Sequence, residues 1–227
     1  MSSRSDSLKE TYIYHIFNKS IDRRQIFFGD ELCRKFLEIL TFYRSSAVHL
    51  RLSEFNELSL DFRRMYEKEI YDKNSFRVNI LCLCLMPTHF HLLLLQKQLK
   101  GISKFMSDVQ NSFTKHFNIK SKRTGPIFIQ TFKSVLMKSD EQLKHVCRYI
   151  LLNPYSGGIL KNNEELITYP WSSFYDYLNT YSTGITEAEL ILKLFDNNRD
   201  RFKAFILANS DYQKTLEYCK YTLTFKV

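Results

Sequence analysis

The segment FRVNILCLCLMPTHFHLLLL (residues 76–95) decides the fold of this chain. Its first ten residues are mostly Phe, Val, Ile and Leu, the composition of a buried strand. Met86-Pro87-Thr88 interrupts that strand, because proline cannot donate to a hydrogen-bond ladder in a sheet interior. Residues 89–95 are apolar again and predict a second strand. The segment therefore predicts a hairpin, around which the remaining elements can be placed.

The elements on either side of this hairpin occur in the order of a ferredoxin-like domain. Apolar periodicity predicts strands over residues 11–19 and 126–137, and helices over residues 30–44 and 102–117. Residues 46–73 are highly charged and predict an additional helix or an inserted arm. The order strand, helix, insert, strand, strand, helix, strand is that of the split β-α-β. We expect an α+β, ferredoxin-like fold with a four- to five-stranded antiparallel sheet and helices on one face.

The sequence after the fourth strand predicts mainly helices. Ser139-Asp140-Glu141 is a good helix start, and Asn153-Pro154 predicts the end of that helix at about residue 152, since the residue before proline avoids the helical region. Two short helices are expected later, the first with a capping box from Thr186 to Glu189. We therefore predict one domain over residues 10–178, with an insertion at about 46–74, and a helical C-terminal extension over residues 179–227.

Composition favours a nucleic-acid partner without deciding the matter. The 227 residues include 33 Lys and Arg against 24 Asp and Glu, a net charge of +9, and 15% are aromatic. Cations suit phosphates and flat rings suit exposed bases, but a basic globular protein with an aromatic core has the same composition. A run of 18 apolar residues is absent, which argues against a membrane span. The polar N-terminus lacks a signal-peptide core, so we expect a cytoplasmic protein.

The five cysteines, an odd number at irregular spacing, predict reduced and mostly buried thiols. Cys82-x-Cys84, close to two histidines, also suggests a zinc site. However, these thiols stand in the middle of an apolar strand and lack the usual loop between zinc ligands. Buried thiols are the favoured interpretation. The cysteines are Cys33, Cys82, Cys84, Cys147 and Cys219.

His89-Phe90-His91 is the first candidate for chemistry. Positions i and i+2 of a strand point to the same face, so the two imidazoles can hold one divalent metal. Two unrelated histidines in a buried strand are the alternative. The preceding proline turn favours a metal site, because it places both residues at the mouth of the hairpin.

His145, Tyr149 and Asn153 form the second candidate. They are four residues apart and therefore share one face of the predicted helix. A phenol with an ordinary pKa of about 10 is a weak nucleophile at neutral pH, but a nearby metal that polarises a phosphate can compensate. Asn153 can supply a third oxygen ligand. Solvated side chains on a polar helix face are the alternative.

A basic stretch predicts contacts to phosphates. Residues 97–133 contain eight Lys and Arg against one acid, Asp108. Clustering over one helix and its following loop is typical of a phosphate track, although a solvated surface is the simpler interpretation. The candidate DNA-binding residues are Lys104, Lys115, Lys120, Lys122 and Arg123, with Lys19, Arg23 and Arg24 after the first strand.

These motifs together resemble the IS200-like transposases, and more closely the REP-associated tyrosine transposases. H-x-H after a Met-Pro turn, followed downstream by Y-I-x-x-N-P, is specific. The matching segments keep the order of the family and cover most of residues 12–178. They are YHIFNK (14–19), LMPTHFHLLL (85–94), HFN (116–118), GPIFIQTFKS (125–134), RYILLNPYSGGI (148–159) and YPWSSFYDY (169–177).

The resemblance implies a ferredoxin-like domain that cleaves and rejoins single-stranded DNA, often near hairpins. His89 and His91 would be the metal-binding histidines, with Mg²⁺ or Mn²⁺ as the cofactor. Tyr149 would be the nucleophile that forms a 5′-phosphotyrosine link. Asn153 stands where compact members place a third polar ligand. The implied partner is single-stranded DNA with a hairpin, and a homodimer is one arrangement that the family allows.

The sequence departs from the family at a few positions and leaves competing functions open. Leu151 replaces a frequent histidine, Thr88 replaces a common Asn or Asp, and the residues after Pro154 lose a basic side chain. None of these changes removes a proposed catalytic group. A non-catalytic module that binds single-stranded DNA or hairpins is the main alternative. An enzyme that nicks replication origins or transfer sites would share the chemistry and differ in its target.

Overall fold

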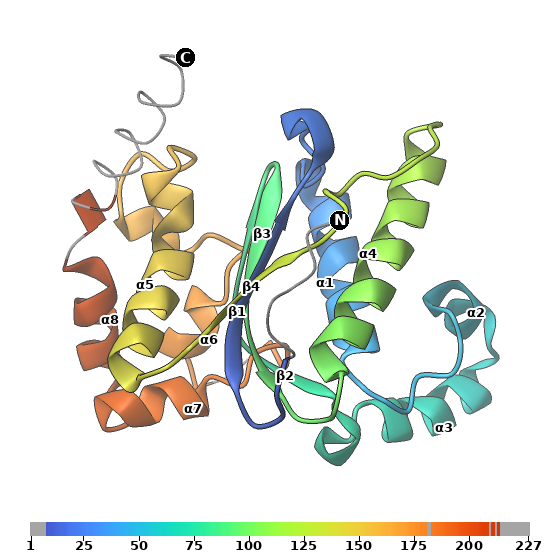
Figure 1. The fold of residues 1–227 in the computed structure, drawn as a ribbon, viewed down its shortest axis with the longest axis horizontal. Helices are drawn as coiled ribbons and strands as arrows, with labels where there is room; N and C mark the ends of the chain where they lie inside the picture. Colours follow the sequence, from blue (N-terminus) through green and yellow to red (C-terminus); the bar gives the residue numbers. More distant parts are fainter. Residues whose placement is uncertain (1–7, 181–182, 209, 212, 214–227) are drawn as a thin grey trace. The chain divides into compact units, whose positions relative to one another are not determined.

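The computed structural model describes residues 8–180, 183–208, 210–211 and 213, and within them it contains a four-stranded sheet (Figure 1). The strand order is β2-β3-β1-β4, which is the order of the split β-α-β and confirms the predicted ferredoxin-like topology. The strands are β1 (Ile13–Lys19), β2 (Val78–Met86), β3 (His89–Gln96) and β4 (Lys133–Leu136).

The chain divides into two compact units that share the two strands of the hairpin. The first unit comprises Met1–Asn79, Pro87–His89 and Leu94–Leu136. The second comprises Ile80–Met86, Phe90–Leu93 and Met137–Val227. Because these units follow the packing of the elements, they do not test the domain boundary expected at residue 178, which stays a prediction.

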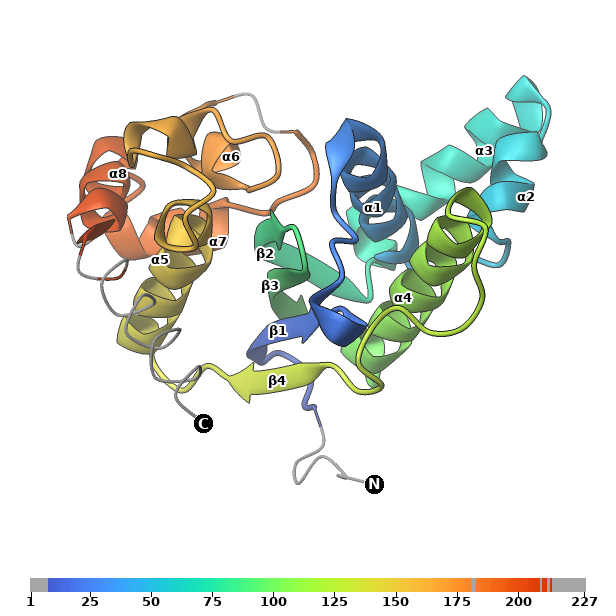
Figure 2. The ribbon, with the colours of Figure 1, turned by 90° about the horizontal axis from the view of Figure 1, so that it is seen from above.

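In the first unit, two long helices pack against each other on one face of β1 (Figure 2). They are α1 (Gly29–Tyr43) and α4 (Gly101–Lys120). Phe36 and Phe113 are completely buried between them, with ring centroids 5.0 Å apart. At the start of α4, a Cβ on Gly101 would lie 2.4 Å from the carbonyl oxygen of Arg77, so only glycine fits there.

β4 is much shorter than the strand predicted over residues 126–137. It pairs antiparallel with β1 from Tyr14↔Leu136 to Phe17↔Lys133. Upstream of it, residues 126–132 lie beside the end of β1 as irregular chain, held by an isolated bridge between Ser20 and Phe128. The apolar residues that suggested a strand here are used for burial: Ile127 and Phe128 are 2% and 5% exposed.

The insert forms two helices, where the sequence predicted one helix or an arm. They are α2 (Leu52–Glu57) and α3 (Leu60–Ile70), followed by a short 3₁₀ turn, η2 (Lys73–Ser75). Phe55 and Ile70 anchor the insert in the first unit, being 3% and 0% exposed. Phe62 and Met65 of α3, in contrast, are 66% and 68% exposed. The helix prediction is therefore confirmed, but its apolar face is only partly buried.

In the second unit, the segment after α5 (Asp140–Ser156) covers the edge of β2. The amide of Leu85 donates to the carbonyl of Trp171 at 2.8 Å, and the amide of Leu83 donates to Ser173 Oγ at 3.0 Å. The hydroxyl of Tyr177, in α6 (Phe174–Leu178), donates to the carbonyl of Leu81. An exposed edge invites pairing with another chain, so this segment protects the sheet.

Helix α5 (Asp140–Ser156) extends four residues beyond its predicted end. Ser139 caps its start, where its hydroxyl accepts from the amide of Gln142 at 3.2 Å. Pro154 lies in the last turn, so it removes only one hydrogen bond from the helix. Ser156 Oγ donates to the carbonyl of Leu152 at 3.1 Å and helps to complete that turn. Asn153 is consequently a helical residue.

Short helices follow α5 in the second unit: η3 (Glu164–Ile167), α7 (Glu189–Leu192), η4 (Lys193–Phe195) and α8 (Arg199–Leu207). The capping box expected from Thr186 to Glu189 is wrong, because α7 begins at Glu189 and Thr186 is buried instead. Tyr177 stacks on Phe202 of α8 at 4.5 Å between ring centroids. Among the described residues, a helix long and apolar enough to cross a membrane is absent.

Candidate active site

The two histidines of the H-x-H motif lie at the start of β3, next to the turn that precedes this strand. His89 is half-buried and His91 is 5% exposed. Because one residue separates them on a strand, their side chains project from the same face. Thr88 Oγ1 lies 3.0 Å from His89 Nδ1. Thr88, one of the departures from the family pattern, therefore contributes a contact that orients the first imidazole.

A basic loop is fastened to the turn that precedes these histidines. This loop contains the 3₁₀ turn η1 (Ile21–Arg23), and its flanks bond to the turn. The amide of Ser20 donates to the carbonyl of Thr88 at 2.8 Å, and the amides of Ile26 and Phe27 donate to the carbonyl of Pro87 at 2.8 and 3.0 Å. Arg24 is exposed in this loop. The loop thus holds cationic side chains beside the mouth of the hairpin.

Backbone hydrogen bonds between β1 and β3 also bring Lys19 to this place. The bonds from Ser20 to Thr88 and from Gln96 to Tyr12 fit one antiparallel register, in which Lys19 stands opposite His89. Lys19 is exposed at the end of β1. Directly opposed residues of an antiparallel pair have side chains on the same face. Lys19 is therefore a spatial neighbour of the H-x-H motif.

Tyr149 of α5 lies against the second histidine. Its ring centroid is 5.5 Å from that of His91, and the two rings meet edge to face at 88°. Both residues belong to the second unit. The structure thus brings together the phenol and one imidazole that the sequence separates by 58 positions.

Two side-chain amides hold the backbone of Tyr149. Asn153 Nδ2 donates to the carbonyl of Tyr149 at 2.7 Å, and Gln213 Nε2 donates to the same carbonyl at 3.2 Å. Asn153 is 5% exposed, and this bond engages its amide nitrogen. Gln213 was missed in the sequence because it is distant in the chain and belongs to no motif.

His145 has a different environment from the other members of its predicted face. Its Nδ1 lies 2.7 Å from the guanidinium of Arg148, and its ring packs on Phe205 at 5.7 Å between centroids. Arg148 itself lies over the Phe205 ring, 4.6 Å from the centroid. Arg148 was not singled out from the sequence, yet it places a cation one residue before Tyr149.

The positions where the chain departs from the family are explained by packing. Leu151 is completely buried, so a core side chain stands where a polar one is frequent. Tyr155 is 8% exposed and its hydroxyl donates to Asp211 Oδ1 at 2.6 Å. A Cβ on Gly157 would lie 2.9 Å from the carbonyl oxygen of Asn153, a backbone atom that cannot turn aside, so this position favours glycine. These residues pack in the interior of the second unit.

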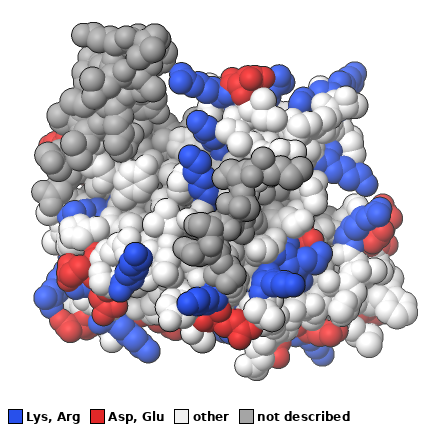
Figure 3. Space-filling model, viewed as in Figure 1, with Lys and Arg blue, Asp and Glu red and all other residues white. Residues whose placement is uncertain are grey.

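The predicted phosphate track is only partly available to a ligand. Lys104 pairs with Asp108 at 2.7 Å, Lys120 pairs with Glu31, and Arg123 donates to Asn118 Oδ1 at 2.6 Å. Within the part of the chain that the structure describes, Lys115 and Lys122 make no ion pair. Figure 3 shows Lys and Arg side chains gathered over the C-terminal end of α4 and the loop that follows it.

The cysteines are core residues. Cys33, Cys82, Cys84 and Cys147 are buried free thiols, and Cys219 lies outside the described residues. Burial raises the pKa of the Cys33 thiol to about 11 and also raises that of Cys84. In the described ranges, clusters of three or more His, Cys, Asp or Glu suited to a metal are absent. A metal site here therefore depends on the two histidines and on amide or solvent oxygens.

The architecture has counterparts among solved structures. A REP-associated tyrosine transposase bound to a REP hairpin matches with a TM-score of 0.54 and 14% identity, over 82% of this chain and 90% of that chain. A candidate transposase from Deinococcus radiodurans R1 has a TM-score of 0.36 and 15% identity, over 66% of this chain and 95% of that one. No family model matches the chain, and no curated protein does.

The fold and the site together define an α+β protein with an H-x-H strand beside a helical tyrosine. The first comparison shows that this is the fold of a REP-associated tyrosine transposase. The resemblance indicated by the sequence motifs is therefore confirmed at the level of the fold.

Proposed function

We propose that this protein is a metal-dependent nuclease and strand transferase that acts on single-stranded DNA with Tyr149 as its nucleophile. The observation that carries the proposal is the edge-to-face contact between Tyr149 and His91, at 5.5 Å between ring centroids. A module that only binds DNA has no need of a phenol held against an H-x-H motif. The solved structure with the same fold is described as a transposase bound to a hairpin, which supports the same class of substrate.

In the proposed reaction, Tyr149 Oη attacks a phosphodiester of the DNA. The new bond joins Oη to phosphorus and the bond to the 3′ oxygen breaks, so the products are a 5′-phosphotyrosine and a free 3′-hydroxyl. The phenol loses its proton to solvent as the bond forms and the departing 3′ oxygen takes one up, so protons balance over the step. Forming the phenolate at neutral pH from a group with a pKa near 10 costs about 4 kcal/mol. Attack of a 3′-hydroxyl on the phosphotyrosine reverses the step and rejoins DNA.

A divalent ion belongs to this proposal because imidazoles and an amide oxygen are donors that such ions take. His89 and His91 would hold it, and the contact of Thr88 Oγ1 with His89 Nδ1 at 3.0 Å would help to orient the first imidazole. Asn153 would add its amide oxygen, since its nitrogen is engaged by the carbonyl of Tyr149. Mg²⁺ or Mn²⁺ suits a site that must also take phosphate oxygen. When bound, such an ion supplies Lewis-acid polarisation of the phosphate.

The cations around the hairpin mouth would position the DNA backbone. Lys19 stands opposite His89, and the loop with Arg23 and Arg24 is bonded to the Pro87-Thr88 turn. Lys115 and Lys122 extend the positive surface along α4 and its following loop. Lys104, Lys120 and Arg123 would contribute less, because each already bonds to a protein group.

A gel assay for covalent adducts tests this proposal. Labelled single-stranded oligonucleotides with hairpins would be incubated with the protein and with Mg²⁺, Mn²⁺ or EDTA. We expect a protein-linked DNA band that requires metal and disappears in Tyr149→Phe, whereas DNA affinity stays within about threefold of the wild type. Tyr175→Phe is the matched control, since Tyr175 is 48% exposed on α6 and lies outside the proposed site.

The second candidate function is a non-catalytic binder of single-stranded DNA or hairpins. It is favoured by the small number of metal-ligating side chains, since the described residues offer two histidines and no larger cluster. In the same assay, shifted but uncut DNA with every metal would support this function and reject the first. An enzyme that nicks origins or transfer sites would give the same adduct, and the DNA sequence recovered in that adduct, rather than the chemistry, would identify it.

A further inference from the structure

A cavity of about 660 Å³ lies in the first unit, away from the strand that carries the histidines. Its walls come from α1, α2 and α4. Ligand pockets in proteins usually have volumes of ~300–1,000 Å³, so this one is large enough for a small organic ligand. Because α2 belongs to the insert, the inserted residues create one whole side of the cavity.

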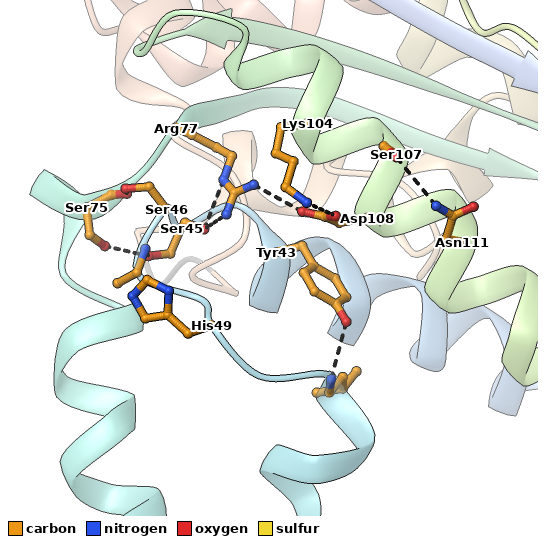
Figure 4. A network of polar contacts seen from close by, with 12 residues as sticks. Tyr43, Ser45, Ser46, His49, Ser75, Arg77, Lys104, Ser107, Asp108 and Asn111 are labelled. Carbon is orange, nitrogen blue, oxygen red and sulfur yellow. Dashed lines mark hydrogen bonds and ion pairs between the residues drawn. The ribbon is translucent and has the colours of Figure 1, made fainter.

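The walls of the cavity are fixed by hydrogen bonds that do not need a ligand (Figure 4). The hydroxyl of Tyr43, on α1, accepts from the amide of Leu52 at 3.3 Å and holds the start of α2. Arg77, which is 5% exposed, donates to the carbonyl of Ser45 at 3.0 Å and to Asp108 at 3.1 Å. These bonds tie the insert to α1 and α4, so the cavity is a built feature.

The same bonds neutralise an acid in the wall. Asp108 accepts from Arg77 and also pairs with Lys104 at 2.7 Å. Its carboxylate is therefore matched by two cations and does not repel an anionic ligand. Because Arg77 and Lys104 neutralise Asp108, this wall of the cavity is compatible with a bound phosphate.

The remaining wall chemistry suits a nucleobase and a phosphate together. Lys115, on α4, makes no ion pair with any described residue and is available to an anion. Asn56 Nδ2 donates to Glu38 and Asn111 Nδ2 donates to Ser107 Oγ, each at 3.4 Å, and a base edge can replace such long bonds, whereas Asn56 Oδ1 is held by Arg63 at 2.6 Å. Glu57 offers an acceptor for an exocyclic amine. Asn and Glu side chains are groups that hydrogen-bond base edges. An inorganic anion alone would leave these amides and most of the volume unused.

His116 provides an independent sign of a missing polar partner. It lines the cavity, and its Nε2 is buried without a hydrogen-bond partner within the described ranges. Burial, with Lys35 nearby, lowers the pKa of this imidazole, so the ring is neutral at pH 7 and can donate or accept. Because this nitrogen is shielded from solvent, a base edge would satisfy it only after the cavity wall shifts.

A second hollow continues the cavity along α4. It has a volume of about 420 Å³ and shares Asn111, Lys115 and Ile119 with the first. It extends to Arg123 and Gly125 in the basic loop. Ile119 is 70% exposed between the two hollows and offers an apolar surface to a flat ring. The two hollows form a furrow that follows the helix and that an extended strand can enter.

We propose that the cavity between α1, α2 and α4 binds one nucleotide, with the base among the amides and the phosphate at Lys115. An unpaired nucleotide of single-stranded DNA is the source that the furrow favours, and in that form the inference rests on the proposed function. A free mononucleotide offers the same chemistry. The insert would then give this chain a contact to DNA outside the cleavage site.

Fluorescence anisotropy on the full chain separates these possibilities. The probes are a labelled hairpin with an eight-nucleotide single-stranded extension, the same hairpin with a blunt end, and unlabelled deoxynucleoside monophosphates. Asn111→Trp and Asn56→Trp fill the cavity from opposite walls, and both positions are exposed, so the fold should tolerate them. Asn74→Trp is the matched control, since Asn74 is exposed in η2 and does not line the cavity.

We expect the wild type and Asn74→Trp to bind the extended hairpin about tenfold more tightly than the blunt one. Both cavity variants should lose this difference while they keep their affinity for the blunt hairpin and their adduct formation. Mononucleotide binding that both cavity variants abolish, without any effect of the extension, would support the cavity with a free nucleotide as its ligand.

Equal affinities of all variants for every probe would overturn the inference and leave the proposed function intact, provided that the adduct with Tyr149 still forms. Conversely, mononucleotide binding by a protein that neither binds nor cuts DNA would reject the proposed function and retain the cavity. Thermal unfolding of each variant checks that the fold is preserved.

Discussion

At the scale of single residues, Asn153 has two separable roles. Its amide nitrogen holds the carbonyl of Tyr149 at 2.7 Å, and its oxygen is the proposed third ligand. Gln213 bonds to the same carbonyl at 3.2 Å but stands outside the proposed donor set. The two residues therefore allow the positioning of the helix to be separated from the binding of metal.

We predict that Asn153→Ala lowers the rate of adduct formation by about 10–100-fold, the effect typical of losing a group that supports a metal site. The Mn²⁺ concentration for half-maximal cleavage should rise in parallel. Gln213→Ala is the control and should change the rate by less than about threefold without altering the metal requirement. Equal effects of the two variants would assign Asn153 to positioning alone. A titration of cleavage against Mn²⁺ measures both quantities.

At the scale of elements, the sequence predicted types and order well and boundaries less well. The hairpin at residues 76–95 was readable because an apolar run, a proline and a second apolar run are local signals. The extension of α5 past Pro154 was not, because it depends on Ser156 and on packing in the second unit. The exposure of Phe62 and Met65 was equally hidden, since the sequence does not say which neighbouring element covers an apolar side chain.

Strand β1 carries a buried histidine whose effect on stability depends on pH. His15 is 7% exposed beside Phe17, and burial lowers its pKa from 6.5 to about 4. The unfolded chain therefore binds more protons than the folded one between these values, and stability falls as pH decreases through this window. A shift of this size makes the folded state about 2 kcal/mol less stable at pH 5 than at pH 7.

We predict that His15→Leu removes most of this difference. Urea unfolding at pH 5 and pH 7 measures this difference. Between pH 7 and pH 5, the free energy of unfolding of the variant should fall by about 2 kcal/mol less than that of the wild type. His49→Leu is the matched control, because His49 is exposed in the insert. The assignment fails if both variants retain the full dependence on pH.

At the scale of the whole molecule, the candidate site was predictable where its residues belong to motifs and hidden where they do not. His89, His91 and Tyr149 belong to short sequence motifs, so they can be identified as candidates from the sequence alone. The cavity near α2 has no such signature, because Asn56, Asn111 and His116 come together only through helix packing. The basic surface was predictable only in part. The sequence gives the number of cationic side chains, but only the structure shows which of them already form ion pairs.

The number of unpaired cations sets how strongly DNA binding depends on salt. Lys19, Arg24, Lys115 and Lys122 make no ion pair with described residues, whereas Lys104 and Lys120 do. For single strands the slope of log affinity against log salt is about −0.7 per phosphate neutralised, so four contacts predict a slope near −3. Lys122→Ala should make the slope less steep by about 0.7. Lys68→Ala, an exposed cation on α3, should leave it unchanged. Anisotropy titrations from 50 to 500 mM salt measure these slopes, and a slope near zero would exclude a phosphate track on this protein.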